Sequence, residues 1–367
     1  MRENLWRAAF ALLLFGQNLS AQRPALWHDP SPHSLRFVAV EEDVKLEVLD
    51  WGGSGRPVIL LAGLGNTAHV FDEFAPKLTP EYHVYGITRR GYGASSIPTT
   101  GYSADRLGDD VVAVLDALKL EHPVLVGHSI AGEELSSIGT RHPERIAGLI
   151  YLDAGYPYAF YDPAKGDYEV DSDDLQRKLA EMLKGPAERK QLTQGLLETD
   201  LPRFERDLRE IATYDDPPPP EPPSTADRAS FAAYASWIAR VQGVRLPEAD
   251  FRQRFESNPD GSIGKSRTPS SVPLAIISGE QKFTDIRVSV LAIYAAPHAQ
   301  PPYLKDNSAA LAIAEASDAA WVAYAKTFET AVPSAHVVRF AHAHHYVFLS
   351  NEADVLREVR AFLAGVH

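Results

Sequence analysis

Ser129 has the surroundings of a catalytic nucleophile. It lies in the stretch Val-Leu-Val-Gly-His-Ser-Ile-Ala-Gly at 124–132, where an apolar, strand-like run is followed by a helical pattern at 130–142. A serine on a sharp turn between a strand and a helix holds its hydroxyl above the sheet, and the helix N-terminus favours an anion beside it. The pattern therefore predicts a nucleophile, with one departure from Gly-x-Ser-x-Gly because residue 131 is alanine.

Three histidines near the end of the chain are candidates for the base that such a serine needs. A neutral imidazole is the group suited to taking a hydroxyl proton near pH 7. His344 and His345 are adjacent and compete for this role, with His342 close by. The three could also ligate zinc, but no Asp, Glu or Cys cluster has matching spacing, so we expect no metal site.

The strands and helices that must position these residues alternate along most of the chain. The strand-like stretches are 36–61, 83–89, 123–127, 146–153, 288–296 and 336–343, and the helical ones are 103–119, 130–142, 308–330 and 351–364. Continuous apolar runs, such as Val58-Ile59-Leu60-Leu61, indicate strands that are covered on both faces. The alternation predicts parallel βαβ units and an α/β fold.

The alternation stops after Asp153 and resumes near residue 286. Residues 155–285 are mostly polar and helical in period, and they include the Pro-rich stretch 215–223, which must be extended. We interpret them as a helical insertion in one α/β domain, whose two parts are 36–154 and 286–367. The alternative is two unrelated domains in tandem, in which the last two strands would have to form a separate sheet.

The first residues have the pattern of a targeting segment. Two arginines flank a short polar region, an apolar core follows at 8–15, and Leu-Ser-Ala at 19–21 precedes Gln22. The apolar core is too short to span a bilayer and is typical of a signal peptide, although a membrane anchor or a buried helix is the alternative. We expect a signal peptide at 1–21, an N-terminal extension at 22–35, and a periplasmic or secreted protein without stable membrane insertion.

Composition restricts the partners. The formal net charge is −13 and no Lys/Arg cluster occurs, which argues against a nucleic-acid partner. The chain has no cysteine, so it has neither disulfides nor a lipoprotein-type lipid anchor. The sequence does not indicate an oligomeric state.

Four stretches resemble the α/β-hydrolase family, in the family's order. Residues 60–78 resemble the loop after its third strand, 86–96 the turn after its fourth, 123–132 its nucleophile elbow, and 342–363 its catalytic-histidine segment. The resemblance implies a mostly parallel eight-stranded sheet with helices on both faces. It also implies that 155–285, inserted after the sixth strand, is the family's cap or lid.

The resemblance assigns the catalytic residues position by position. Ser129 is the nucleophile, and His345 is favoured as the base over His344 because an aromatic and apolar stretch follows it. The family's usual acid, just after the seventh strand, has no counterpart before Asp306. Asp153 stands at the end of the sixth strand, a position that some members use, so it is favoured over Asp306.

The neighbours of the elbow have further expected roles. The oxyanion hole should come from the N–H groups of Leu64 and Ile130, although Ala62 replaces a histidine that is frequent in the family. His128 is expected to pack or hydrogen-bond under the loop. Glu133 and Glu134 lie in the first turn of the helix, where the helix dipole is expected to stabilise their carboxylates, with a rim charge or a histidine partner as the alternative.

An aromatic run follows Asp153 and leads into the insertion. Tyr156, Tyr158, Phe160 and Tyr161 either pack the hinge or line an apolar substrate pocket.

The expected function is that of an exported serine hydrolase. It would cleave carboxylic esters, or lactones, of small to medium, largely apolar substrates through an acyl-enzyme, without metal or organic cofactor. Amide hydrolysis, C–C bond hydrolysis and acyl transfer remain alternatives on this fold, as does a ligand-binding protein with a vestigial triad.

Overall fold

The computed structural model describes residues 27–212, 215 and 217–366. The predicted signal peptide lies outside the described residues, as does the start of the predicted extension at 22–35. The chain divides at Pro30, and the fold described below is that of the unit that begins at Ser31.

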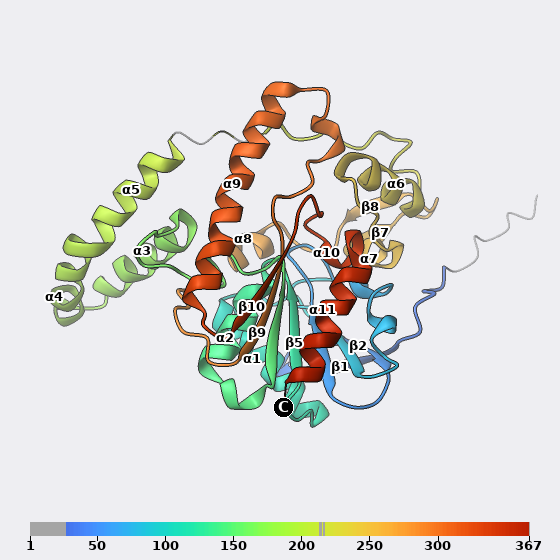
Figure 1. Ribbon diagram of the computed structural model, residues 1–367, viewed down its shortest axis with the longest axis horizontal. Coiled ribbons are helices and arrows are strands. Elements are labelled where there is room, and N and C mark those ends of the chain that lie inside the picture. The colour runs from blue at the N-terminus through green and yellow to red at the C-terminus, as the bar shows by residue number, and fades with distance from the viewer. Residues whose placement is uncertain (1–26, 213–214, 216, 367) are drawn as a thin grey trace, which may run out of the picture. The chain divides into compact units, whose positions relative to one another are not determined.

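An eight-stranded sheet forms the centre of this unit (Figure 1). In spatial order its strands are β1 (Ser34–Glu41), β2 (Val44–Gly52), β4 (His83–Ile87), β3 (Pro57–Leu61), β5 (Val124–His128), β6 (Gly148–Leu152), β9 (Ser289–Ala295) and β10 (Ala335–Phe340). Strand β2 pairs antiparallel with β1 and with β4, and the other neighbours in the sheet are parallel. The predicted mostly parallel, eight-stranded sheet is confirmed.

Helices cover both faces of this sheet, as the doubly apolar strands predict. On one face lie α1 (Ala104–Leu118), α2 (Ala131–Arg141) and α9 (Ser308–Ala331), and on the other lies α11 (Glu352–Gly365). Successive side chains of β5 point to opposite faces, so Leu125 packs in the core with α2, whereas Val124 and Val126 pack in the core with α11.

The chain between β6 and β9 is largely helical. It contains α3 (Tyr168–Met182), α4 (Pro186–Gly195), the π-helix η4 (Leu196–Asp200), α5 (Leu201–Ile211), α6 (Phe231–Gln242), α7 (Glu248–Arg254) and α8 (Ser271–Ile277). It also holds the antiparallel hairpin β7 (Phe255–Ser257) and β8 (Ile263–Ser266), which the polar pattern does not predict. The described residues of the Pro-rich stretch have neither helix nor strand. That this region serves as a cap remains a prediction.

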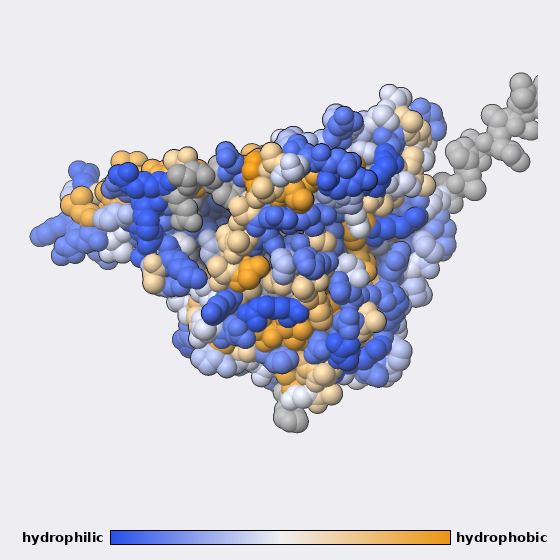
Figure 2. Space-filling view, turned by 45° about the horizontal axis from the view of Figure 1, so that its top comes forward, coloured by the Kyte–Doolittle hydropathy of each residue, from blue (hydrophilic) through white to orange (hydrophobic). Residues whose placement is uncertain are grey.

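Short helices complete the loops at the edge of the sheet. They are η1 (Ala68–Phe71), η2 (Ala75–Lys77), η3 (Pro143–Arg145), η5 (Pro302–Leu304) and α10 (Val347–Ser350). On the face seen in Figure 2, hydrophobic residues form small patches between hydrophilic ones. Within the described part of the chain, every helix is too short or too polar to cross a membrane.

Candidate active site

Ser129 occupies the turn between β5 and α2. Its φ angle is +55°, a left-handed conformation that is strained for a serine and must be held by its surroundings. The Ser129 N–H donates to the Leu152 carbonyl at the end of β6, with 3.3 Å between the two atoms. The side chain lines a cavity of about 720 Å³. The elbow therefore presents the hydroxyl to a space that can hold a substrate.

Gly132, and not residue 131, is the glycine that this turn requires. A Cβ atom on Gly132 would lie only 2.1 Å from the Ala154 carbonyl oxygen, so no larger residue fits without movement. Ala131, in contrast, is fully buried in the apolar core that α2 shares with the sheet. Alanine at 131 is thus compatible with the turn.

Asp153 lies directly after β6 and is fully buried. Its Oδ2 contacts His345 Nδ1 at 2.7 Å and His298 Nε2 at 2.8 Å. Its Oδ1 accepts hydrogen bonds from the Tyr156 hydroxyl at 2.6 Å and the Ala295 N–H at 3.0 Å. Burial acts to raise the pKa of Asp153, but the hydrogen bonds from His298 and His345 outweigh it and hold the pKa well below its usual value. Asp153 is therefore a charged carboxylate, and the rings of His298 and His345 both donate hydrogen bonds to it.

His345 is oriented by this carboxylate. Because charged Asp153 can only accept, the proton of neutral His345 is on Nδ1, and Nε2 keeps a free lone pair. His345 is 37% exposed and lines the same cavity as Ser129. No hydrogen bond joins Ser129 to His345 among the described residues, and Tyr158 lines the cavity together with Ser129. Catalytic hydrogen bonds of this type often form only once substrate is bound.

His344 is engaged elsewhere through both ring nitrogens. Nδ1 accepts from the Tyr346 N–H and Nε2 donates to the Gln242 carbonyl, each at 3.1 Å. Burial, followed by the nearby His345, lowers the pKa of His344 to about 4. Its neutral ring has no free lone pair and instead ties the histidine loop to the end of α6.

The structure does not gather the remaining alternatives at the site. His342 is exposed, and its backbone N–H donates to the Pro297 carbonyl at 2.7 Å. The three neighbouring histidines therefore do not converge as zinc ligands. Asp306 is exposed after η5 and has no hydrogen bond or ion pair with any described residue.

Two residues that the sequence reasoning missed extend the site. His298, in the loop after β9, faces Asp153 through Nε2 and Asp318 of α9 through Nδ1, and its backbone N–H donates to Asp318 at 3.0 Å. Burial alone would lower the pKa of His298, yet the two carboxylates raise it to about 9. His298 is thus an imidazolium between two carboxylates, at the strand end where the family's usual acid was sought.

His128 supports the backbone of His345. Its Nε2 lies 3.1 Å from the His345 carbonyl oxygen, and its ring packs against Tyr346 and Phe348. Burial, followed by the charge of His345, holds the pKa of His128 well below its usual value. The neutral ring therefore donates to the His345 carbonyl, in line with the expected packing and hydrogen-bonding role.

The predicted oxyanion loop lies against the elbow. A Cβ atom on Gly63 would be 3.1 Å from the Ser129 Cβ. Among the described residues, the N–H groups of Leu64 and Ile130 have no hydrogen-bond acceptor. Two unused donors beside the nucleophile are what an oxyanion hole needs.

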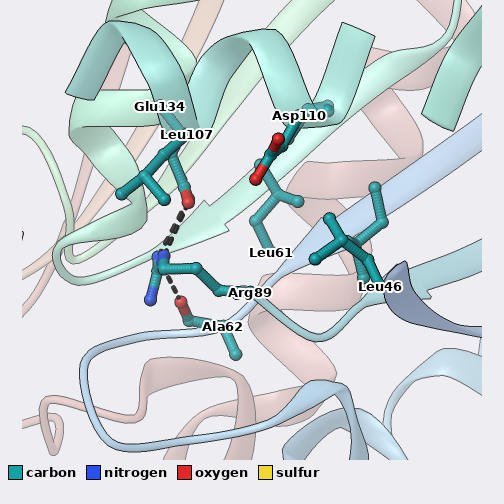
Figure 3. Close-up of a pocket in the computed structure, with 9 residues that line it drawn as sticks. Leu46, Leu61, Ala62, Arg89, Leu107, Asp110 and Glu134 are labelled. Carbon is teal, nitrogen blue, oxygen red and sulfur yellow. Dashed lines mark hydrogen bonds and ion pairs between the residues drawn. The ribbon is translucent and has the colours of Figure 1, made fainter. Parts of the chain in front are cut away.

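A buried ion pair connects this loop to α2. Arg89 donates to both carboxylate oxygens of Glu134, at 2.6 and 2.9 Å, and to the Ala62 carbonyl at 2.9 Å (Figure 3). Glu133, in contrast, is fully buried and neither of its carboxylate oxygens has a partner. Burial, followed by nearby Glu280, raises the pKa of Glu133 well above its usual value. A raised pKa disfavours the charged form, so the interaction with the helix dipole that was expected of Glu133 is weakened.

The aromatic run after Asp153 divides between the cavity and the core. Tyr156 and Tyr158 line the cavity, as predicted for pocket residues. Phe160 does not reach it, because its ring packs against Phe328 of α9 with 5.9 Å between centroids. Tyr161 donates its hydroxyl to the Asp171 carboxylate.

Curated relatives match this chain over short stretches. The 2-(acetamidomethylene)succinate hydrolase of Mesorhizobium japonicum is 27% identical over 101 residues, which is 28% of this chain and 36% of that protein. An AB hydrolase superfamily protein of Bacillus subtilis, YisY, is 36% identical over 137 residues, covering 33% and 49%. The 3-oxoadipate enol-lactonase 2 of Acinetobacter baylyi is 31% identical over 110 residues, covering 30% and 41%. The chain therefore spans less than half the length of these relatives.

Solved structures match it over nearly the whole chain. The crystal structure of E-2-(acetamidomethylene)succinate hydrolase has a TM-score of 0.55 at 18% identity and covers 91% of this chain and 100% of its own. A carboxylesterase from Bacillus subtilis has a TM-score of 0.51 at 14% identity, covering 92% and 94%. At identities of 14–18%, the similarity shows a shared fold and does not by itself assign an activity. A family model for the alpha/beta hydrolase fold matches residues 56–352. This chain belongs to the α/β-hydrolase fold family.

Proposed function

We propose that this protein is a serine hydrolase that cleaves carboxylic esters or lactones of small to medium, largely apolar substrates. The observation that carries the proposal is the 2.7 Å contact between Asp153 and His345, with His345 and Ser129 on one cavity. A charged, fully buried carboxylate selects the His345 tautomer that can take a proton from a hydroxyl. The lactonase among the relatives agrees with this chemistry.

The reaction follows from these roles. His345 Nε2 takes the Ser129 proton while Oγ attacks the substrate carbonyl, and the N–H groups of Leu64 and Ile130 stabilise the oxyanion. His345 then gives the proton to the leaving alkoxide, which departs and leaves an acyl-Ser129 ester. A water molecule, deprotonated by His345, releases the acid and restores Ser129. Asp153 stays ionised throughout and stabilises the imidazolium.

Amide hydrolysis, C–C bond hydrolysis and acyl transfer share this acyl-enzyme logic and are the alternatives. The relatives' names include a carbamate hydrolase as well as the lactonase. An ester and amide panel with varied acyl length separates these activities. Export, with removal of 1–21, is part of the proposal and rests on the sequence pattern alone.

Labelling with a fluorophosphonate tests the nucleophile. We expect wild-type protein to label at Ser129 and Ser129→Ala to remain unlabelled. Ser129→Ala and His345→Ala should each lower kcat by a factor on the order of 10⁵–10⁶. The matched control, His344→Ala, should be mild because His344 has no free lone pair. A folded wild-type protein that fails to label would favour the ligand-binding alternative.

A further inference from the structure

The cavity beside Ser129 is lined by one cation, Arg254, that contacts none of the triad residues. Most of its lining is apolar or aromatic, including Ile238, Val244, Leu246, Pro301 and Trp321. Of the charged residues in that lining, His298 and Asp318 neutralise each other through a direct ion pair. Arg254, the last residue of α7, is the remaining cation among the described lining residues.

Arg254 is only partly engaged by protein groups. Its Nη1 lies 3.3 Å from Asp250 Oδ2, and among the described residues its Nε and Nη2 have no hydrogen-bond partner. Asp250 does not depend on this contact, because it is fully buried and accepts three hydrogen bonds of 2.8–2.9 Å from Asn66 and Thr67. The Arg254 side chain is 26% exposed and lines the cavity, so the two nitrogens without a hydrogen-bond partner can reach a ligand there.

The position of this guanidinium is fixed from two sides. It packs on the rings of Phe251 and Phe255, with 5.5 and 5.6 Å to the centroids. Arg254 Nη2 lies 3.9 Å from the place where a Cβ on Gly65 would be, next to Leu64 of the proposed oxyanion hole. The two unpaired nitrogens of Arg254 therefore lie near the end of the cavity where the scissile carbonyl would bind.

We propose that Arg254 forms a carboxylate subsite, so that the preferred substrate is an ester or lactone with an apolar body and one free carboxylate. This inference rests on the proposed hydrolase function. The fork of a guanidinium matches a carboxylate, and a charge-assisted pair in a partly dry cavity is stronger than a neutral hydrogen bond. The formal net charge of −13 repels anions at long range, so a carboxylate needs a local cation to bind. The two unpaired nitrogens of one guanidinium match the two oxygens of one carboxylate.

Matched ester pairs test this subsite. Monomethyl glutarate and methyl 5-methylhexanoate have the same shape but differ by a carboxylate in place of an isopropyl group. We expect wild-type enzyme to favour the glutarate ester in kcat/KM, and Arg254→Met to lower that preference by about tenfold or more. Arg254→Lys keeps the charge but loses the fork, and it should lower the preference less. Monomethyl adipate and suberate report how far the carboxylate lies from the carbonyl.

The control variant, Arg252→Met, removes one positive charge from the same helix at a residue that does not line the cavity. Arg252 pairs with Glu248 and stacks on Phe231, with 4.4 Å to the centroid, and it does not line the cavity. Arg252→Met should leave the ratio of the two kcat/KM values at the wild-type level. An unchanged ratio in Arg254→Met, or an equal fall in Arg252→Met, would overturn the subsite.

A binding measurement separates this inference from the hydrolase proposal. Calorimetric titration of Ser129→Ala with glutarate and adipate should give a Kd that rises by about tenfold or more when Arg254→Met is added. Binding that depends on Arg254, together with a folded wild-type protein that a fluorophosphonate fails to label, would overturn the hydrolase function and keep the subsite. Ester cleavage with no dependence on Arg254 would overturn the subsite and keep the hydrolase function.

Discussion

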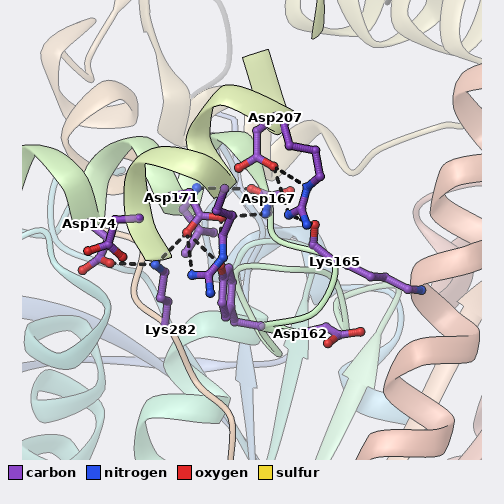
Figure 4. A network of polar contacts seen from close by, with 12 residues as sticks. Asp162, Lys165, Asp167, Asp171, Asp174, Asp207 and Lys282 are labelled. Atoms are coloured by element: carbon purple, nitrogen blue, oxygen red, sulfur yellow. Dashed lines mark hydrogen bonds and ion pairs between the residues drawn. The ribbon is translucent and has the colours of Figure 1, made fainter. Parts of the chain in front are cut away.

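The strand ends of the sheet and the inserted helices α3–α5 hold their polar side chains in different ways. At the strand ends, Ser129 and Asp153 have φ angles of +55° and +49°, and their backbone N–H groups donate to neighbouring strands. In the insertion, Lys282 lies 2.6 Å from both Asp171 and Asp174, and these ion pairs join α3 to the segment before β9 (Figure 4). Backbone geometry positions the first set, and long side chains position the second.

The strand ends therefore position the catalytic residues, whereas the insertion shapes the cavity. Parallel strands bring their carboxyl ends to one edge of a sheet, so the positions of Ser129, Asp153 and His298 relative to each other follow from strand pairing. The residues that the insertion contributes to the cavity, such as Ile238 and Arg254, depend on how its helices pack. We therefore expect substitutions at the strand ends to affect turnover strongly, and substitutions in the ion pairs of the insertion to affect stability weakly.

The largest effect should come from Asp153→Asn. An amide in this place cannot stabilise the imidazolium and favours the wrong His345 tautomer, so kcat should fall by a factor on the order of 10³–10⁴. Asp306→Asn should leave kcat within about twofold, because Asp306 is exposed and remote from any histidine contact. Steady-state kinetics on the same ester decide between them. A larger loss in Asp306→Asn would show that the acid has been assigned to the wrong strand end.

His298 should give the next largest effect, on stability as a function of pH. Its pKa is raised from 6.5 to about 9 in the folded protein. The imidazolium therefore stabilises the fold fully below pH 6.5, and this contribution is lost as the pH rises through 9. At about 1.4 kcal/mol for each pKa unit, the whole loss is on the order of 3–4 kcal/mol, most of it between pH 6 and pH 9.

Urea unfolding at pH 6 and pH 9 measures this loss. The free energy of unfolding of His298→Gln should fall less over this range than that of wild type, because glutamine carries no charge to lose. His342→Gln, at an exposed histidine, should follow wild type. Equal pH dependence in wild type and His298→Gln would mean that His298 is not held as an imidazolium between Asp153 and Asp318.

The contrast between the two regions also explains what the sequence could predict. The strands, the elbow at Ser129 and the strand-end position of Asp153 follow from apolar runs a few residues long, which is why their predicted places agree with the structure. His298 was missed because its role depends on Asp318, a residue of α9 that reaches the site only through tertiary packing. The family's usual acid is a carboxylate at this position after β9, whereas this chain has a histidine there.

The insertion was less predictable for the same reason. The sequence indicates its helical period but not the hairpin β7–β8, and Phe160, a candidate for the pocket lining, packs on α9 instead. A period shows which face of a helix is apolar, and it does not show what that face packs against. Arg254 in particular has no signal in the sequence that separates it from Arg252 two residues earlier.

Gly132→Ala should have the third largest effect and sharpens the description of the elbow. The added Cβ would lie 2.1 Å from the Ala154 carbonyl oxygen, so the helix or the strand end must move. We expect a loss of about 1–3 kcal/mol in the free energy of unfolding, together with reduced turnover. The reverse change at the neighbouring position, Ala131→Gly, should cost about 1 kcal/mol through helix propensity and retain turnover. Similar effects of both changes would place the tight contact at 131 after all.

The smallest effect should come from Lys282→Met in the insertion. Lys282 is 21% exposed, and buried Asp171 keeps the Tyr161 hydroxyl and Arg203 as partners when Lys282 is lost. The free energy of unfolding should therefore fall by only about 1 kcal/mol. Lys184→Met is the matched control, since Lys184 is 68% exposed and pairs with Glu181 within α3 and its C-terminal turn, and its effect should be smaller still. Because Lys282 lies outside the cavity lining, kcat/KM should stay within about twofold of wild type. If Lys282→Met instead lowered kcat/KM strongly while the fold stayed intact, the ion pairs of α3 would have to position the cavity wall, and the division between a catalytic sheet edge and a separately held insertion would not stand.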